Sequence, residues 1–175
     1  MPERSDLSDL ADLSDLAERS RLSPPSATVT DVPVLTAAGR AWLEDRLARG
    51  SERLEHIAEE LENERSEELI AERRQLREQL DELTRLLRAA VAPADVVDDP
   101  TIVEVGDEVE VEFPGGSCET FLIVHPVEAG MDEHRTASDA PLARAVLGRR
   151  IGDRVTVSSP AGVYGVTLLS RERIG

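Results

Sequence analysis

The chain has no lysine, one cysteine, and only four aromatic residues among its 175 residues. A single cysteine, Cys118, excludes an internal disulfide and fits a reducing compartment. Four aromatic side chains are too few to line the apolar pocket that many small-molecule enzymes use. No apolar run reaches the roughly 18 residues that span a bilayer, and the amino terminus lacks the basic and apolar segments of a signal peptide. We therefore expect a cytoplasmic protein that makes no contact with a membrane.

Acidic residues dominate the charge: 36 are acidic and 20 are basic, all of them arginine, which gives a net charge of -16. Strong direct binding to nucleic acid is disfavoured, because no basic cluster is present to release counterions from a phosphate backbone. A basic protein surface is the expected kind of partner. The histidines and the cysteine lack metal-ligand spacing, and no phosphate loop or nucleophile elbow is present. We expect no enzyme activity, no cofactor and no metal belonging to this chain alone.

Residues 34–92 read as a helical hairpin. Apolar residues recur at alternating spacings of four and three, as in a coiled-coil seam. The first limb carries Leu43, Leu47, Gly50, Leu54, Ile57 and Leu61, and the second carries Leu69, Leu76, Leu80, Leu83 and Leu87. Asn63 and Ser66 interrupt the pattern and favour a turn, with Ser66 as the N-cap of the returning helix.

Six glutamates gather where this hairpin turns. They are Glu59, Glu60, Glu62, Glu64, Glu67 and Glu68. Two interpretations remain open for them. The cluster either binds an ion or presents charge at a distant site, or it keeps a long helix solvated, since glutamate is a good helix former.

Residues 1–33 form an acidic segment of different composition. Residues 5–16 repeat Ser/Ala-Asp-Leu four times, and Pro24 and Pro25 follow. A period of three drifts around an α-helix by about 60° per repeat, so the leucines form no stable stripe. We expect disorder, with a short helix formed on a partner as the alternative.

Residues 93–100 predict a linker, and residues 101–175 predict a small antiparallel β domain. Valines from 103 to 111 alternate with glutamates across a Gly106-Asp107 turn, and Pro114 to Ser117 turn the chain back into Thr120 to Val127. A short helix, Leu142 to Leu147, is opened by Pro141 and stopped by Gly148. Two further strands are expected at 154–158 and 163–169. The predicted fold class is α+β.

These parts, in this order, resemble the GreA/GreB transcription elongation factors. The matching segments are Ile102-Val103-Glu104-Val105-Gly106-Asp107-Glu108-Val109, Ser138 to Gly148, Ile151 to Val157 and Pro160 to Tyr164, with Leu35-Thr36, Gly39 and Leu43 at the start of the hairpin. The resemblance implies a coiled coil followed by an FKBP-like β domain. It does not imply prolyl isomerase activity, because a fold does not fix a function.

The resemblance also implies a partner, the core enzyme of bacterial RNA polymerase. In the family, the hairpin enters the secondary channel, and in cleavage-promoting members an acidic pair at the tip helps to hold a second Mg²⁺ of the polymerase. Glu60 and Glu62 match that pair only with a one-residue deletion. The family tyrosine is missing, Arg65 intrudes, and each limb is shorter than the family pattern by about one turn, roughly 5 Å.

Three functions remain open. The altered tip favours a monomeric regulator that binds RNA polymerase and inhibits transcription; a true cleavage factor and an interaction protein of the same fold with another partner are the alternatives. The resemblance implies docking through the β domain. Within it, the proline-led helix and the residues after it supply apolar surface and arginines, so we expect docking at Pro141, Leu142, Arg144, Arg149 and Arg150.

Overall fold

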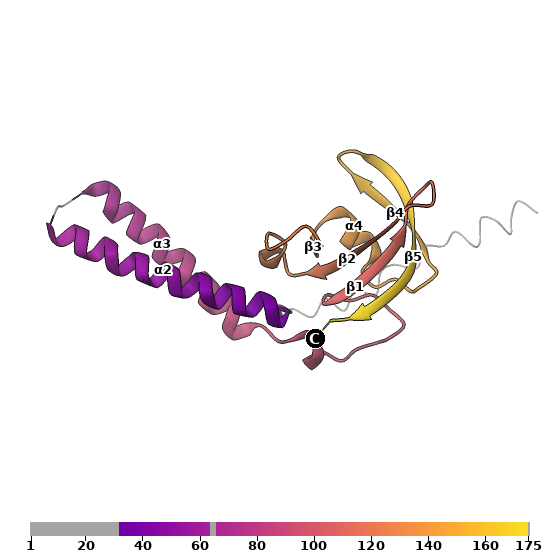
Figure 1. The fold of residues 1–175 in the computed structure, drawn as a ribbon, viewed down its shortest axis with the longest axis horizontal. Coiled ribbons are helices and arrows are strands. Elements are labelled where there is room, and N and C mark those ends of the chain that lie inside the picture. Colours follow the sequence, from indigo (N-terminus) through magenta and orange to yellow (C-terminus); the bar gives the residue numbers. More distant parts are fainter. Residues whose placement is uncertain (1–31, 64–65, 175) are drawn as a thin grey trace, which may run out of the picture.

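The computed structural model describes residues 32–63 and 66–174; the predictions for residues 1–31, Glu64 and Arg65 lie outside the described residues. Helix α2 (Ala37–Asn63) and helix α3 (Glu67–Ala89) lie side by side and project away from a sheet domain (Figure 1). At 1.5 Å per residue, the 27 residues of α2 give an arm about 40 Å long. Within the described ranges, no helix is both long enough and apolar enough to cross a membrane.

The predicted seam holds the two helices together. Leu43, Ile57 and Leu80 are buried, and the other seam leucines are half-buried. Gly50 faces Leu80, since a β-carbon on Gly50 would lie 2.5 Å from a terminal methyl carbon of Leu80. The absence of a side chain at Gly50 therefore gives Leu80 its space between the limbs.

Backbone hydrogen bonds close the base of the hairpin. Leu35 N donates to Val91 O, and Val91 N donates to Pro33 O, both at 3.0 Å. The guanidinium of Arg40 donates to two carbonyl oxygens near the end of α3, those of Leu87 and Ala90. These bonds satisfy carbonyls that a helix end leaves without a partner, and they fix the entry and exit of the hairpin together.

A five-stranded sheet forms the second part, in the order β3-β2-β1-β5-β4. Its strands are β1 (Asp107–Glu112), β2 (Cys118–Val124), β3 (Arg135–Ala137), β4 (Arg154–Ser159) and β5 (Gly162–Arg173). Short 3-10 helices occupy Pro93–Asp95 (η2) and Pro126–Glu128 (η3). Helix α4 (Pro141–Val146) packs against β4, and its Ala143 and Val146 join a core built from inward-facing residues such as Val109, Val111 and Leu168. The predicted α+β class is confirmed.

Several local predictions need correction. Val103 and Val105 precede the first strand instead of belonging to it: the Val103 N–H donates to Arg149 O, so it is not part of a strand ladder. The expected second strand ends at Val124, because Pro126 starts η3. The sheet is not wholly antiparallel, since the short strand β3 pairs parallel to β2. Strand β5 also continues past Leu169 to Arg173.

The proline-led helix α4 is confirmed, although it ends at Val146, one residue before the expected Leu147. Gly148 follows with φ of 73°, a left-handed conformation that glycine adopts at low cost. Its N–H donates to Val103 O. The turn after α4 is therefore hydrogen-bonded to the segment that leads into β1.

Candidate functional site

The tip of the hairpin is helical where the matched acidic pair lies. Helix α2 continues through Asn63, whose side-chain amide donates to Glu59 O at 3.0 Å. At 100° per residue, the side chains of Glu60 and Glu62 leave the helix about 200° apart. The two carboxylates consequently point to opposite sides of α2.

Glu60 is also contacted by two neighbouring basic side chains. Its carboxylate lies 3.4 Å from Nε2 of His56 and 3.8 Å from the guanidinium of Arg53. Arg53 in turn binds Glu72 on α3 at 2.9 Å, so this cluster links the two limbs. Exposed ion pairs of this kind are weak, but they direct the Glu60 carboxylate toward the shaft. His56 is exposed.

The other described acidic residues of the tip are exposed. They are Glu59, Glu62, Glu67 and Glu68. The Ser66 side chain accepts a hydrogen bond from Leu69 N, which confirms the predicted N-cap and places Glu67 and Glu68 in the first turn of α3. Carboxylates there interact favourably with the helix dipole. Within residues 32–63 and 66–174, no three acidic, histidine or cysteine side chains gather closely enough to hold a metal ion.

The predicted docking residues lie on α4 and the turn that follows it. Pro141, Arg144 and Arg150 are exposed, whereas Leu142 is half-buried against the core and Arg149 is half-buried. Leu142 thus contributes to packing of the domain as well as to its surface.

Three arginines on this side form what we call the arginine surface: Arg144, Arg149 and Arg150. Within the described residues none of the three makes an ion pair, whereas Arg135, Arg171 and Arg173 of the same domain all do. Ile151, beside Arg150, is 42% exposed. An apolar side chain next to arginines that make no described ion pair suits recognition of a surface that is both acidic and apolar.

A buried carboxylate joins the hairpin to the sheet domain. Glu128, at the end of η3, is fully buried, and its Oε1 accepts from Thr36 N at 3.1 Å. Its Oε2 accepts from the Thr36 hydroxyl and from Arg135 at 3.2 Å. Thr36 Oγ1 accepts in turn from Gly39 N at 2.9 Å, in the manner of an N-cap for α2. We call Thr36, Gly39, Glu128 and Arg135 the base clamp.

The base clamp was not predicted as a unit. Thr36 and Gly39 were singled out only through the family resemblance, and Glu128 lies between the strand expected to end at Val127 and the helix expected to begin at Pro141. The clamp spans 92 residues of sequence between Thr36 and Glu128, so no local pattern marks it. A buried charge is retained only where it is paired and hydrogen-bonded, and Glu128 meets both conditions.

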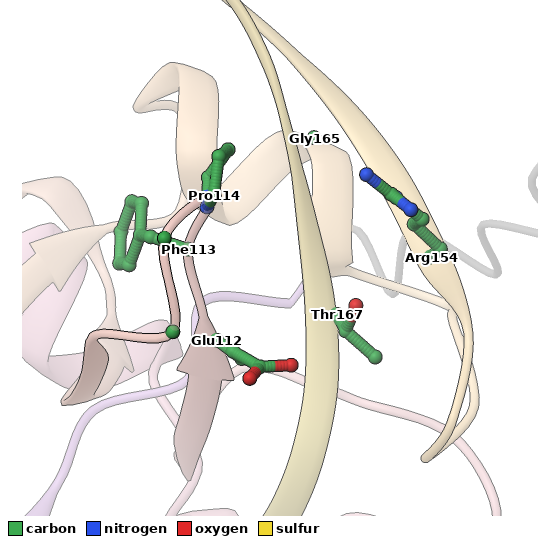
Figure 2. Close-up of a pocket in the computed structure, with 8 residues that line it drawn as sticks. Glu112, Phe113, Pro114, Arg154, Gly165 and Thr167 are labelled. Atoms are coloured by element: carbon green, nitrogen blue, oxygen red, sulfur yellow. The ribbon is translucent and has the colours of Figure 1, made fainter.

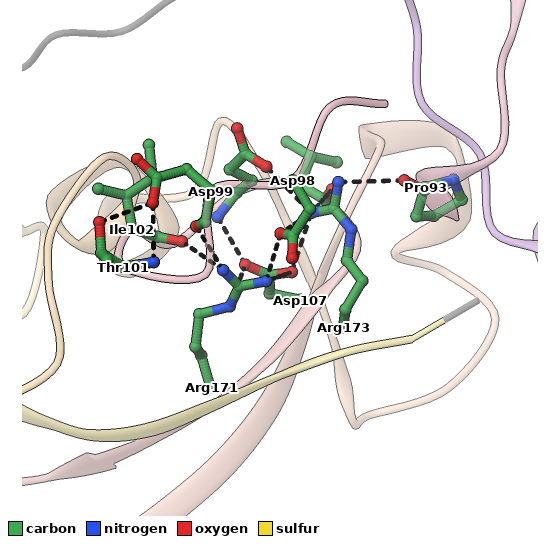
Figure 3. A network of polar contacts seen from close by, with 10 residues as sticks. Pro93, Asp98, Asp99, Thr101, Ile102, Asp107, Arg171 and Arg173 are labelled. Atoms are coloured by element: carbon green, nitrogen blue, oxygen red, sulfur yellow. Dashed lines mark hydrogen bonds and ion pairs between the residues drawn. The ribbon is translucent and has the colours of Figure 1, made fainter. Parts of the chain in front are cut away.

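A second buried carboxylate, Asp107, ties the linker and the last strand to the sheet (Figure 3). Its oxygens lie 3.1 Å from Nε of Arg171 and 2.9 Å from Nη1 of Arg173. The same arginines reach the linker: Arg171 pairs with Asp98 at 2.6 Å, and Arg173 donates to Pro93 O at 3.1 Å. The path from α3 to β1 is consequently anchored to β5.

Burial raises the pKa of Glu104, which borders this network, above its ordinary value; Arg173 opposes that rise. Glu104 N donates to Asp107 at 2.8 Å, and its carboxylate lies 3.3 Å from Arg173. Arg173 therefore lies within ion-pair distance of three carboxylates, those of Asp98, Glu104 and Asp107. Asp107 is the fully buried one.

A shallow pocket of about 210 Å³ lies where β1 ends (Figure 2). It is lined by Glu112, Phe113, Pro114, Gly115, Gly116, Arg154, Gly165 and Thr167. The ring of Phe113 packs near that of Tyr164, with centroids 5.9 Å apart. The lining includes no histidine or cysteine to pair with the Thr167 hydroxyl, so it offers no activated nucleophile.

Comparison with known proteins identifies the sheet domain. Residues 99–173 match the family described as "Transcription elongation factor, GreA/GreB, C-term". The chain is 37% identical over 89 residues to transcription elongation factor GreA of Geobacillus kaustophilus, covering 50% of this chain and 56% of that protein. It is 35% identical over 96 residues to GreA of Oceanobacillus iheyensis, covering 54% and 61%. The chain thus spans somewhat over half the length of these curated relatives.

Among solved structures, GreA factor homolog 1 of Thermus thermophilus is similar, with 25% identity, a TM-score of 0.37, and coverage of 81% of this chain and 99% of that one. The relatives at 35% and 37% identity and the match over residues 99–173 agree on the same description. By these sequence matches, the sheet domain, residues 99–173, is similar to the carboxy-terminal domain of the GreA/GreB transcription elongation factors.

Proposed function

We propose that this protein binds bacterial RNA polymerase core enzyme through the secondary channel and inhibits transcription without stimulating transcript cleavage. One observation supports the choice above all: α2 stays helical through Asn63. Glu60 and Glu62, which match the acidic pair of the cleavage factors, therefore diverge on opposite sides of the helix. Glu60 is further engaged by His56 and Arg53. Such a function belongs in the cytoplasm.

Distance dependence explains why such a tip can inhibit without assisting catalysis. Inner-sphere coordination of Mg²⁺ requires oxygen atoms at about 2.0 to 2.1 Å in near-octahedral geometry. Two carboxylates about 200° apart on one helix do not provide that geometry to a single ion. A Coulomb interaction declines only as the inverse of distance, so exposed glutamates such as Glu62, Glu67 and Glu68 can still attract the polymerase's Mg²⁺ or repel an incoming nucleotide.

The base clamp supports this proposal because it fixes the direction in which the hairpin carries the tip glutamates. A hairpin held to the sheet domain by the buried Glu128 projects in a defined direction from whatever surface the domain binds. Docking is assigned in this proposal to the arginine surface with Pro141 and Leu142 beside it. The guanidinium of an arginine presents several donors in a fixed geometry to a carboxylate partner, so this surface suits an acidic region at the channel rim.

The test replaces five tip glutamates of the full chain by glutamine, which removes charge and keeps size. The substituted positions are Glu60, Glu62, Glu64, Glu67 and Glu68. A matched control makes the same change at five exposed shaft glutamates: Glu44, Glu52, Glu55, Glu78 and Glu82. Both variants should bind core enzyme like the wild type, and only the tip variant should lose inhibition of RNA synthesis.

The same purified proteins are then added to backtracked elongation complexes. We expect no release of short RNA fragments above the level of polymerase alone. Rapid release by the wild type, abolished by Glu60→Ala or Glu62→Ala, would overturn the inhibitor assignment and establish a cleavage factor. Failure to bind core enzyme at all would point to a different partner.

A further inference from the structure

The arginine surface is unusual in this acidic chain. Arg144, Arg149 and Arg150 lie within seven positions of one another, on α4 and its following turn, and none makes an ion pair with another described residue. Ile151 adds an exposed apolar side chain beside them. Arginines without a described ion pair, next to an apolar residue in a protein of net charge -16, attract acidic segments of the same chain as readily as those of a partner.

The chain supplies such a segment in residues 1–31. They contain seven acidic and three basic residues, a net charge of -4. The acidic residues concentrate in the Asp-Leu repeat of residues 5–16, which has four aspartates, four leucines and no arginine. Charge and apolar anchors therefore occur together in the repeat, as they do on the arginine surface.

The repeat is tethered close to the domain that carries this surface. The described chain begins at Val32, and Thr36 is already bonded to Glu128 of the sheet domain. The fifteen residues between the repeat and Val32 can span at most about 50 Å. A tether of this length gives an effective concentration on the order of millimolar, so a few weak ion pairs suffice for substantial occupancy.

We propose that the Asp-Leu repeat of residues 5–16 binds the arginine surface in the free protein and competes there with an acidic partner surface. The aspartates pair with Arg144, Arg149 and Arg150, and a leucine packs on Ile151. The competition rests on the proposed function, because it assigns polymerase docking to the same arginines; the intramolecular contact does not.

Other arginines without a described ion pair offer a poorer site. Arg73, Arg74 and Arg77 lie exposed on α3, but an acidic residue flanks them on each side along the helix, Glu72 before them and Glu78 after them. Arg154 lines the pocket that also contains Glu112. The arginine surface combines three arginines with the exposed Ile151, and we expect the repeat to prefer it.

The contact is tested first without polymerase. A nitroxide is attached at Ser8→Cys in the full chain with Cys118→Ser, and amide signals are followed by NMR. Broadening is expected at residues 144–151, and the double variant Arg144→Gln with Arg150→Gln should reduce it.

The control variant, Arg73→Gln with Arg74→Gln, should leave the broadening unchanged. Addition of 0.5 M NaCl should weaken the broadening because salt screens exposed charges. Absence of broadening, or broadening indifferent to the Arg144 and Arg150 changes, overturns the proposal.

Competition is measured with the full chain carrying asparagine in place of Asp6, Asp9, Asp12 and Asp15. At low salt this variant should bind core enzyme about 3- to 30-fold more tightly than the wild type. Weaker binding would show that the repeat contacts the polymerase itself, and would overturn competition. If neither protein binds polymerase, the proposed function fails, while the NMR result still decides the intramolecular contact.

Discussion

Gly39 lies so close to the carboxylate of Glu128 that a β-carbon at position 39 would be 1.9 Å from Oε2. Only a residue without a side chain leaves Glu128 room to accept from Thr36 and Arg135 together. Glycine inside a helix ordinarily costs about 1 kcal/mol relative to alanine. Here glycine is needed in the helix because it leaves space for the Glu128 carboxylate, which joins the hairpin to the sheet domain.

Gly39→Ala should therefore destabilise the protein despite the better helix propensity of alanine. Overpacking a buried site costs about 1 to 3 kcal/mol, so we expect a net loss of up to about 2 kcal/mol in urea unfolding. Nitroxides on the exposed Cys118 and on Ala58→Cys should also report a broader distance distribution between the sheet domain and the hairpin.

Gly130→Ala is the matched control for Gly39→Ala. No atom lies within 4 Å of a β-carbon built there, and φ at Gly130 is not left-handed. That variant should leave both measurements unchanged. An unaltered distance distribution in Gly39→Ala would mean that the base clamp does not hold the hairpin.

Leu80→Ala tests the seam. Leu80 is 7% exposed and packs against Gly50, so removing its side chain should cost about 2 to 5 kcal/mol. Because the arm has only two helices, hydrogen exchange should rise between residues 50 and 80 while the sheet keeps its protection. Ile70→Ala, at a position 42% exposed, should cost far less. Uniform loss of protection would show that arm and sheet unfold as one unit.

Asp107→Ala should be among the most damaging substitutions in the sheet domain. Removing one partner of a buried ion pair typically costs 3 to 5 kcal/mol. We expect about 3 kcal/mol, because Arg171 keeps Asp98 and Arg173 keeps Glu104. Urea unfolding measures the effect, with Glu172→Gln on the exposed part of β5 as control. Equal stability of the two variants would contradict a structural role for Asp107.

Glu104→Gln should change the pH dependence of stability. Burial raises the folded-state pKa of Glu104 above 4.5, so its stabilising contribution is present below about pH 4.5 and is lost as pH rises through the folded-state pKa. Glutamine stays neutral throughout. The variant should match or exceed the wild type in urea midpoint at pH 7, and this advantage should shrink at pH 4. A loss of stability at pH 7 would mean that the ion pair with Arg173 outweighs burial.

Local rules account for what could be predicted from the sequence. The spacing of Leu43, Ile57 and Leu80 indicated the seam, and Ser66 was recognisable as a cap because capping depends on neighbouring residues. Strand β3 was missed because three residues give no usable alternation. Val103 was assigned to a strand on its pattern, whereas its N–H bonds to Arg149 O across 46 positions.

The candidate site divides in the same way. The sequence identified Arg144, Arg150 and the tip glutamates as candidate site residues. It could not show which of these side chains form ion pairs. The approach of Arg53 to Glu60 and Glu72 depends on how two helices meet. The structural roles of Glu128 and Asp107 could be recognised only in the folded protein, where distant segments meet. Burial of a single carboxylate produces no periodic pattern in the sequence that would predict it.

The base clamp also makes the hairpin a lever. With α2 about 40 Å long, a rotation of about 5° at Glu128 displaces the tip by roughly 3.5 Å, more than the length of a metal–oxygen bond. Small changes in packing around Thr36, Gly39 and Arg135 would therefore redirect the tip carboxylates as effectively as substitutions at the tip itself. The base clamp thus sets the direction in which the arm points, and the length of α2 sets how far the tip extends.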